Sequence, residues 1–370
     1  MKKQTRETKY LRVYQYLKAY IDQKKFTLDT KLPSEIFLSN KFSISRETVR
    51  TAMRKLADEG AIYTVKGSGT YFDKVHALEN GHLTQNEKVR IAFIAQGQDF
   101  NTSSNVAKGI RHALDHDSIE LKIFLTENKL ANELKCLESC YTGFDGIIVD
   151  GVKASVLNPN LGCYFRLAEQ NIRIIFYNNY YLHTNFPKVI IDDASCADLL
   201  VKNLTERGHT HIAGIFVYDN YQGIEKYKGY VQSILKYGAV FDDDYVKWCI
   251  SDETYDGKTF PKILMKFIRR LSQVTAIVCG NYMILNMVRE MLSLHGKKVP
   301  GDYSLVCFDY SGPDWEHSPI TASIHPGFAM GVEVGQRILE MVADEDYKSK
   351  DYSYVFPPKI HVGNSIKDLG

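Results

Sequence analysis

The sequence predicts an α/β protein in which a short, mainly helical segment precedes a much larger part built from alternating strands and helices. Helically spaced apolar side chains followed by a short hairpin pattern mark the beginning of the chain. From residue 89 onward, short β-branched runs such as "VRIAFIA" and "GIIVDG" recur, with stretches between them that are long enough for a helix. Buried strands alternating with helices indicate parallel sheets with helices on both faces. Because about 280 residues exceed the usual size of one core, we expect two lobes.

The amino-terminal segment, residues 1–74, has the pattern of three helices and a hairpin. Val13 and Leu17 belong to an apolar face with helical spacing. Ser34 is placed to cap a second helix and Ser45 a third. The runs "IYTV" and "TYF" flank the glycine-rich turn "KGSG" and predict a hairpin. Helices followed by such a hairpin predict a winged helix-turn-helix.

Charge is distributed unevenly along the chain, although the whole carries only +2. Residues 1–74 contain 16 Lys and Arg against 8 Asp and Glu, a net charge of +8, and the remainder contains 30 against 36, a net charge of −6. This asymmetry indicates that only the first part contacts a polyanion. Residues 75–88 are mostly polar without sustained periodicity and are expected to form a linker, which leaves 89–370 as the second domain.

Several classes of protein are disfavoured by what the sequence lacks. Its apolar runs are too short to span a bilayer, and no apolar stretch follows the charged N-terminus as in a signal peptide. Seven scattered cysteines fit a reducing compartment, so we expect a cytoplasmic protein without membrane contact. The patterns GxxxxGK[ST], GxSxG and HExxH are absent. We therefore expect no enzyme, no catalytic residue, no cofactor and no metal site.

The stretch "LPSEIFLSNKFSISRETVRTAMRKLADEGAIYTVKGSGTYF" resembles the GntR family of bacterial repressors. The resemblance implies that Arg46 and Arg50 contact DNA, and the guanidinium fork suits guanine or a phosphate. The family usually has an arginine after "LPSE", where this chain has Ile36, so that backbone contact is not expected. The full set of expected DNA-binding residues is Ser34, Glu35, Ser45, Arg46, Thr48, Arg50, Lys66, Gly67 and Gly69.

The phrases "ERGHTHIAGI", "VPGDYSLVCFDYS" and "SIHPGFAMG" resemble the LacI/GalR sensor domain, which is itself similar to periplasmic sugar-binding proteins. A GntR-type head on such a sensor, together with "GVKASVLNPN", is similar to the class of L-arabinose-responsive repressors. The resemblance implies a two-lobed periplasmic-binding-protein-like domain with a small sugar effector between its lobes. It also implies a homodimer that binds a palindromic operator in double-stranded DNA and represses carbohydrate-utilisation genes.

Candidate effector-binding residues follow predicted strands, because open α/β sheets bind ligands at the carboxyl ends of their strands. Two positions depart from the class, which usually has arginine where this chain has Lys226 and aspartate where it has Tyr282. L-arabinose, another sugar, a sugar phosphate or acid, and a partner protein all stay open as the ligand. The candidates are Asp99, Phe100, Asp150, Lys153, Lys226, Asn281, Tyr282, Asp309, Trp315 and His325.

Overall fold

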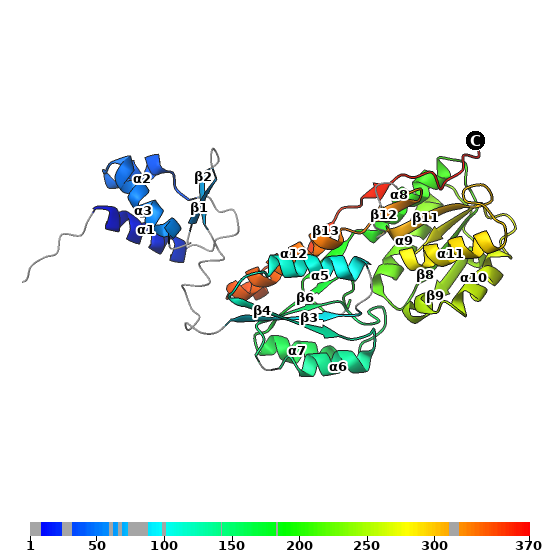
Figure 1. Ribbon diagram of the computed structural model, residues 1–370, viewed down its shortest axis with the longest axis horizontal. Helices are drawn as coiled ribbons and strands as arrows, with labels where there is room; N and C mark the ends of the chain where they lie inside the picture. The colour runs from blue at the N-terminus through cyan, green and yellow to red at the C-terminus, as the bar shows by residue number, and fades with distance from the viewer. Residues whose placement is uncertain are drawn as a thin grey trace, which may run out of the picture. The chain divides into compact units, whose positions relative to one another are not determined.

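The computed structural model describes residues 9–23, 32–58, 62–65, 69–72, 88–97, 101–141, 143–182, 184–310 and 318–370. The chain divides into two compact units, Met1–Lys88 and Val89–Gly370 (Figure 1). Residues 75–87 of the expected linker lie outside the described residues. No helix within the described ranges is long and apolar enough to cross a membrane.

The described residues of the first unit form three helices and a hairpin, as the sequence predicts. Val13, Leu17, Leu38, Val49 and Leu56 are buried in its core. The two strands of the hairpin are antiparallel. The elements are α1 (Lys9–Gln23), α2 (Glu35–Phe42), α3 (Arg46–Asp58), β1 (Ile62–Val65) and β2 (Gly69–Phe72).

Local hydrogen bonds fix the start of α2 and the turn between α2 and α3. The Ser34 hydroxyl accepts from the amide of Phe37 at 3.2 Å and caps α2. Ser43 ends α2 in the left-handed conformation, at φ 52°. The Ser45 hydroxyl accepts from the amide of Thr48 at 3.3 Å at the start of α3. Both predicted cap serines therefore act as caps.

In the second unit, the residues that the structure describes form two six-stranded sheets. The sheet of the first lobe has the order β13-β7-β6-β5-β3-β4, and that of the second lobe β14-β12-β11-β10-β8-β9. Every pairing within them is parallel except that of β12 with β14. The strands are β3 (Val89–Ala95), β4 (Ile119–Leu125), β5 (Gly146–Val149), β6 (Arg173–Tyr177), β7 (Lys188–Ile191), β8 (Ile212–Val217), β9 (Val246–Cys249), β10 (Ala276–Cys279), β11 (Ser304–Tyr310), β12 (Thr321–Ile324), β13 (Tyr354–Phe356) and β14 (Ile360–His361).

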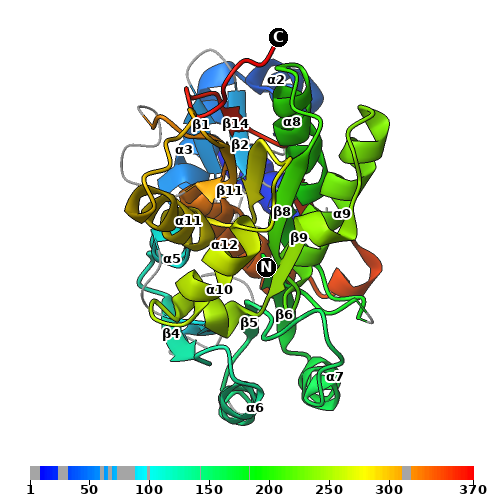
Figure 2. The same cartoon turned by 90° about the vertical axis from the view of Figure 1, so that its right-hand side faces the viewer.

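Helices cover both faces of each sheet, which confirms the predicted α/β architecture. In the first lobe, α5 and α12 lie on one face and α6 and α7 on the other (Figure 1). In the second lobe, α8 and α9 lie opposite α10 and α11 (Figure 2). The helices are α5 (Asn101–Ala113), α6 (Leu130–Glu138), α7 (Leu161–Glu169), α8 (Asp193–Thr205), α9 (Tyr221–Lys236), α10 (Phe260–Ile268), α11 (Tyr282–Leu294) and α12 (Gly327–Ala343), with short 3₁₀ helices η1 (Asp243–Tyr245), η2 (Ser251–Tyr255) and η4 (Tyr347–Ser349).

Within the described residues, the chain crosses between the lobes three times. It leaves the first sheet after β7 to form α8, returns from β12 to form α12, and leaves again between β13 and β14. The first two crossings place Asp193 and His325 at the junction of the lobes. Three connections restrict how the lobes can move relative to each other.

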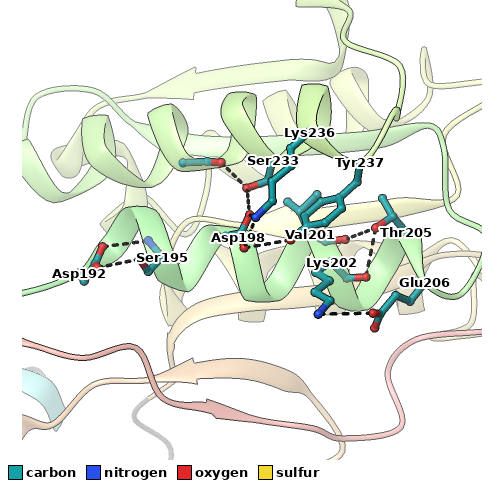
Figure 3. A network of polar contacts seen from close by, with 11 residues as sticks. Asp192, Ser195, Asp198, Val201, Lys202, Thr205, Glu206, Ser233, Lys236 and Tyr237 are labelled. Carbon is teal, nitrogen blue, oxygen red and sulfur yellow. Dashed lines mark hydrogen bonds and ion pairs between the residues drawn. The ribbon is translucent and has the colours of Figure 1, made fainter.

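Helices α8 and α9 of the second lobe are joined by a polar network (Figure 3). The carboxylate of Asp198 accepts hydrogen bonds from Ser233 at 3.2 Å, Lys236 at 2.9 Å and Tyr237 at 3.0 Å. Asp192 caps α8 by accepting from the amide of Ser195 at 2.9 Å. The helix after the first crossing is therefore fixed both at its start and along its length.

Helices α5 and α12 approach each other closely through glycines. A Cβ atom added to Gly331 would lie 2.1 Å from the carbonyl oxygen of Val106. One added to Gly109 would lie 2.1 Å from the carbonyl oxygen of Phe328. Backbone atoms cannot move aside as a flexible side chain does, so the two helices pack at this distance only because both positions lack a side chain.

Replacing Gly331 by alanine tests this contact. We expect Gly331→Ala to lower the free energy of unfolding of the second unit by on the order of 3 kcal/mol, because the added methyl group overlaps backbone atoms of α5. Urea denaturation followed by circular dichroism measures the change. The control is Gly257→Ala, whose Cβ meets nothing within 4 Å. Equal stability of the two variants would contradict the close packing.

Candidate functional site

A cavity of about 820 Å³ lies between the two lobes of the second unit. Its walls come from segments that follow β3, β4, β5 and β6 in the first lobe and β8, β9 and β10 in the second, joined by the end of β11. These are the carboxyl ends of the parallel strands, where open α/β sheets place their ligands. The volume suits a small molecule.

The structure brings six of the ten predicted effector-binding residues together at this cavity. Lys153 does not line it but lies nearby, beside Asp252, which does. Asp99, Phe100 and Trp315 lie outside the described residues. The six that line the cavity are Asp150, Lys226, Asn281, Tyr282, Asp309 and His325.

The ammonium group of Lys226, which belongs to α9, is surrounded by hydrogen-bond acceptors. Its ammonium group donates to the carboxylate of Asp309 and to the carbonyl of Gly280 at 3.4 Å, and it lies 4.0 Å from Asp193. Burial, which leaves the residue 3% exposed, acts to lower the pKa of Lys226. The charges of Asp309 and Asp193 outweigh burial and raise the pKa. Lys226 is therefore a charged internal counter-ion.

Asp150 presents a partly satisfied carboxyl group to the cavity. One of its oxygens accepts hydrogen bonds from Asn179 at 3.0 Å and from Gln96 at 3.3 Å. The residue lines the cavity, so its carboxyl group is within reach of a ligand. Burial raises the pKa of Asp150 to about 7, although the hydrogen bonds from Asn179 act against the rise. The group can thus accept from a ligand hydroxyl or, when protonated, donate to one.

Three buried polar atoms of the cavity wall lack a hydrogen-bond partner within the described structure. They are Nδ2 of Asn128, Nε2 of Gln222 and Nδ1 of His325. The other ring nitrogen of His325 contacts Asn178 at 3.0 Å. Burial lowers the pKa of His325 to about 4, so the ring is neutral at physiological pH. Buried polar groups are rarely left unpaired, and a ligand rich in hydroxyl groups would satisfy all three.

Sequence reasoning missed Asn128, Asn178 and Gln222. Asn178 directly follows β6, and its left-handed backbone, at φ 54°, turns the chain at the strand end. Asn128 lies three positions after the last residue of β4, and Gln222 is the second residue of α9, the helix that follows β8. The signal that could have found them is their place just beyond a strand end, the same signal that identified Asp150.

The first unit presents Arg46 and Arg50 on the outer surface of α3. Their side chains are 57% and 51% exposed. Glu35 of α2 contacts both: Nε of Arg50 donates to its carboxylate at 3.1 Å, and Arg46 lies 3.8 Å away. Glu35, an expected DNA-binding residue, thus holds both guanidinium groups in the free protein. Ser34 serves as the cap of α2.

The other expected DNA-binding positions are only partly described. Ser45 and Thr48 lie at the amino-terminal end of α3, the end that enters the groove in helix-turn-helix docking. Gly69 begins β2, whereas Lys66 and Gly67 lie outside the described residues. Ile36 is 55% exposed, which leaves an apolar surface at the position where the family usually has an arginine.

Comparison with known proteins agrees with both units. Residues 9–72 match the bacterial regulatory proteins of the gntR family, and residues 201–366 match the periplasmic binding protein-like domain. Among the described residues, no group of three or more His, Cys, Asp and Glu is placed to hold a metal ion. The two units together define a DNA-binding transcriptional regulator that joins a GntR-type helix-turn-helix domain to a two-lobed sensor. This confirms the predicted combination of domains.

Two full-length relatives and a solved structure show which transcriptional regulators the chain is similar to. The chain is 28% identical over 366 residues to the arabinose metabolism transcriptional repressor of Geobacillus stearothermophilus, covering 98% of both proteins. It is 27% identical over 367 residues to the protein of that name from Halalkalibacterium halodurans, covering 98% of this chain and 97% of the other. The structure of the transcription regulator CcpA of Lactococcus lactis shares the fold, with a TM-score of 0.65 and 19% identity over 76% of this chain and 100% of that one.

The pKa of Asp150 predicts a pH-dependent stability. Because the folded-state pKa of about 7 exceeds the unfolded value near 3.9, the folded state binds more protons between these limits. The contribution of Asp150 to the free energy of unfolding therefore falls as pH rises from about 4 to about 7. We expect Asp150→Asn to remove this contribution, a difference on the order of 3 kcal/mol, in denaturation curves recorded across that range.

Asp302, a carboxylate whose pKa is lowered rather than raised, provides the control. Hydrogen bonds from the amide of Lys298 and from Lys297 lower the pKa of Asp302. Its contribution to stability is therefore present above the unfolded pKa and lost as pH falls, so Asp302→Asn changes the curve with the opposite sign. Stability curves of Asp150→Asn and the unchanged protein that run parallel would contradict the assignment.

Proposed function

We propose that this chain is a cytoplasmic repressor of carbohydrate-utilisation genes whose effector is a neutral sugar, L-arabinose foremost, bound between the lobes. The observation that carries the proposal is the charge balance of the cavity. Its described lining includes the carboxyl groups of Glu127, Asp150, Asp252 and Asp309. The one lining ammonium group among these residues, that of Lys226, is already paired.

The excess of carboxyl groups over unpaired ammonium groups in the described lining favours a ligand that donates hydrogen bonds. Sugar hydroxyl groups donate well to carboxylates, and they can also accept from the unpaired amides of Asn128 and Gln222. A sugar phosphate or uronic acid would instead bring a negative charge against several carboxyl groups without an unpaired cation to meet it. The similarity to arabinose metabolism repressors supports L-arabinose as the first candidate.

The basic helix-turn-helix supports an operator as the macromolecular partner. A homodimer would present two copies of α3 to the half-sites of a palindrome. Effector binding can change DNA affinity only if the sugar binds the two conformations of the sensor with different affinity. Closure of the cavity around the sugar provides such a difference.

The effector is tested by a thermal-shift series on the full chain with L-arabinose, D-galactose, D-ribose, ribose 5-phosphate and glucuronate. We expect L-arabinose to raise the melting temperature by mass action and the two anions to leave it unchanged. In Asp309→Asn, which removes the carboxylate that Lys226 contacts most closely, the shift should disappear. A shift with an anion alone would contradict the charge argument, and no shift with any sugar would favour a partner protein as the ligand.

The DNA interface is tested with Arg46→Ala and Arg50→Ala. We expect each to weaken binding to a duplex selected from random-sequence DNA by roughly 10- to 100-fold, because each removes a guanidinium contact to a base or a phosphate. Fluorescence anisotropy over a range of salt concentrations measures the affinity and its salt dependence. Arg54→Ala is the matched control, since Arg54 is exposed on the same helix but lies nearer its carboxyl end. Equal losses in all three variants would contradict the specific roles.

A further inference from the structure

A loop of the first lobe reaches across to the second lobe. It follows β5 and has the sequence "GVKASVLNPN". Nζ of Lys153 lies 3.3 Å from a carboxylate oxygen of Asp252 and 3.8 Å from one of Asp219. The hydroxyl of Ser155 donates to the carbonyl of Tyr218. These contacts join the lobes through residues that belong to none of the three chain crossings.

The loop is fixed on the first lobe by a buried carboxylate. Glu133 of α6 is fully buried. The amide of Val152 donates to the hydroxyl of Tyr181 at 2.9 Å, and the amide of Lys153 donates to Asn128 at 3.4 Å. A loop tied down at this many points holds the Lys153 backbone in place, at φ 45°. Glu133 accepts hydrogen bonds from four neutral donors, those of Asn158, Asn160, Tyr164 and Tyr181.

Asp219, a carboxylate of the second lobe that Lys153 contacts, is also held in place by hydrogen bonds. Asp219 follows β8 and is 4% exposed. One of its oxygens accepts from the amide and the hydroxyl of Ser251, at 2.8 and 2.7 Å. Its other oxygen is buried and has no hydrogen-bond partner within the described structure. A buried carboxylate oxygen is costly without a compensating charge, and the ammonium group of Lys153 supplies that charge only while the lobes are together.

We propose that Lys153, Asp219 and Asp252 form an ionic latch that holds the two lobes together in the absence of effector and so sets the affinity of the cleft. Opening the lobes would separate Lys153 from both carboxylates. The latch therefore shifts the population toward the closed form, which a ligand contacting both lobes binds. Lys153 then acts as a positioning residue rather than through contact with the effector.

The latch is tested on the full chain without any ligand, by measuring the distance between the lobes. Spin labels are placed at Glu138→Cys on α6 and Lys262→Cys on α10, both exposed positions on different lobes. The seven native cysteines are all buried, so the labels attach selectively. We expect Asp219→Asn and Lys153→Met each to move the distance distribution from double electron–electron resonance to longer values, and Lys153→Arg to keep it short.

The control and the double variant decide between a latch and general loosening. Asp302→Asn breaks an ion pair with Lys297 that lies within the second lobe and should leave the distance unchanged. The double variant Lys153→Met/Asp219→Asn should move the distance no further than Lys153→Met alone, because that change already removes the ion pairs with both carboxylates. An unchanged distance in the single variants, or additive changes in the double variant, would overturn the latch.

A second readout rests on the proposed function and uses L-arabinose as the probe. Asp219 does not line the cavity, so Asp219→Asn can act on the sugar only through the lobes. We expect this variant to bind L-arabinose with roughly three- to tenfold lower affinity and unchanged stoichiometry in calorimetry. Loss of affinity in Lys153→Met but not in Asp219→Asn would overturn the latch in favour of direct contact. No binding by the unchanged protein would refute L-arabinose as effector, while the ligand-free distances would still decide the latch.

Discussion

The buried ammonium group of Lys226 joins the strand ends of the second lobe to the first crossing between the lobes. Lys226 ties the end of β11, through Asp309, to the end of β10, through the carbonyl of Gly280, and lies beside Asp193, where the chain has just crossed between the lobes. A fully buried charge is tolerated only with opposite charges and hydrogen bonds around it. The strand ends, the first crossing and the floor of the cleft therefore share one electrostatic constraint, and a neutral residue at this position would leave two carboxyl groups uncompensated.

Most of the fold could be predicted from the sequence because its signals are local and strong. Cap serines at Ser34 and Ser45, helical spacing in α1 and α3, and repeated β-branched runs each determine an element independently of distant contacts. The three crossings between the lobes are different. Nothing in the short strands β13 and β14 reveals that one pairs in the first sheet and the other in the second, since that depends on which edges are left open by the rest of the chain.

The candidate site could be predicted only where chemistry and position coincide. Asp150 and Asp309 were recognisable because a carboxylate at a strand end suggests ligand binding. Asn128 and Gln222 share the position just beyond a strand end but carry no charge, and their unpaired amides become apparent only when the cavity wall is assembled. The pairing of Lys226 also escaped the sequence. Departure from arginine suggested a changed ligand contact, whereas in the structure the ammonium group is directed at Asp309, an interaction between residues 83 positions apart.

The glycine contact between α5 and α12 joins these two helices of the first lobe rigidly. Helix α12 begins immediately after the second crossing, so any turn of the lobes about that point rotates its first residues. Because Gly109 and Gly331 bring the two backbones into direct contact, α5 must follow α12 without slack. Strand β3, which precedes α5, begins at Val89, the first residue of the sensor unit. The residue at which the chain enters the sensor therefore belongs to the same packed block as the helix that follows the second crossing.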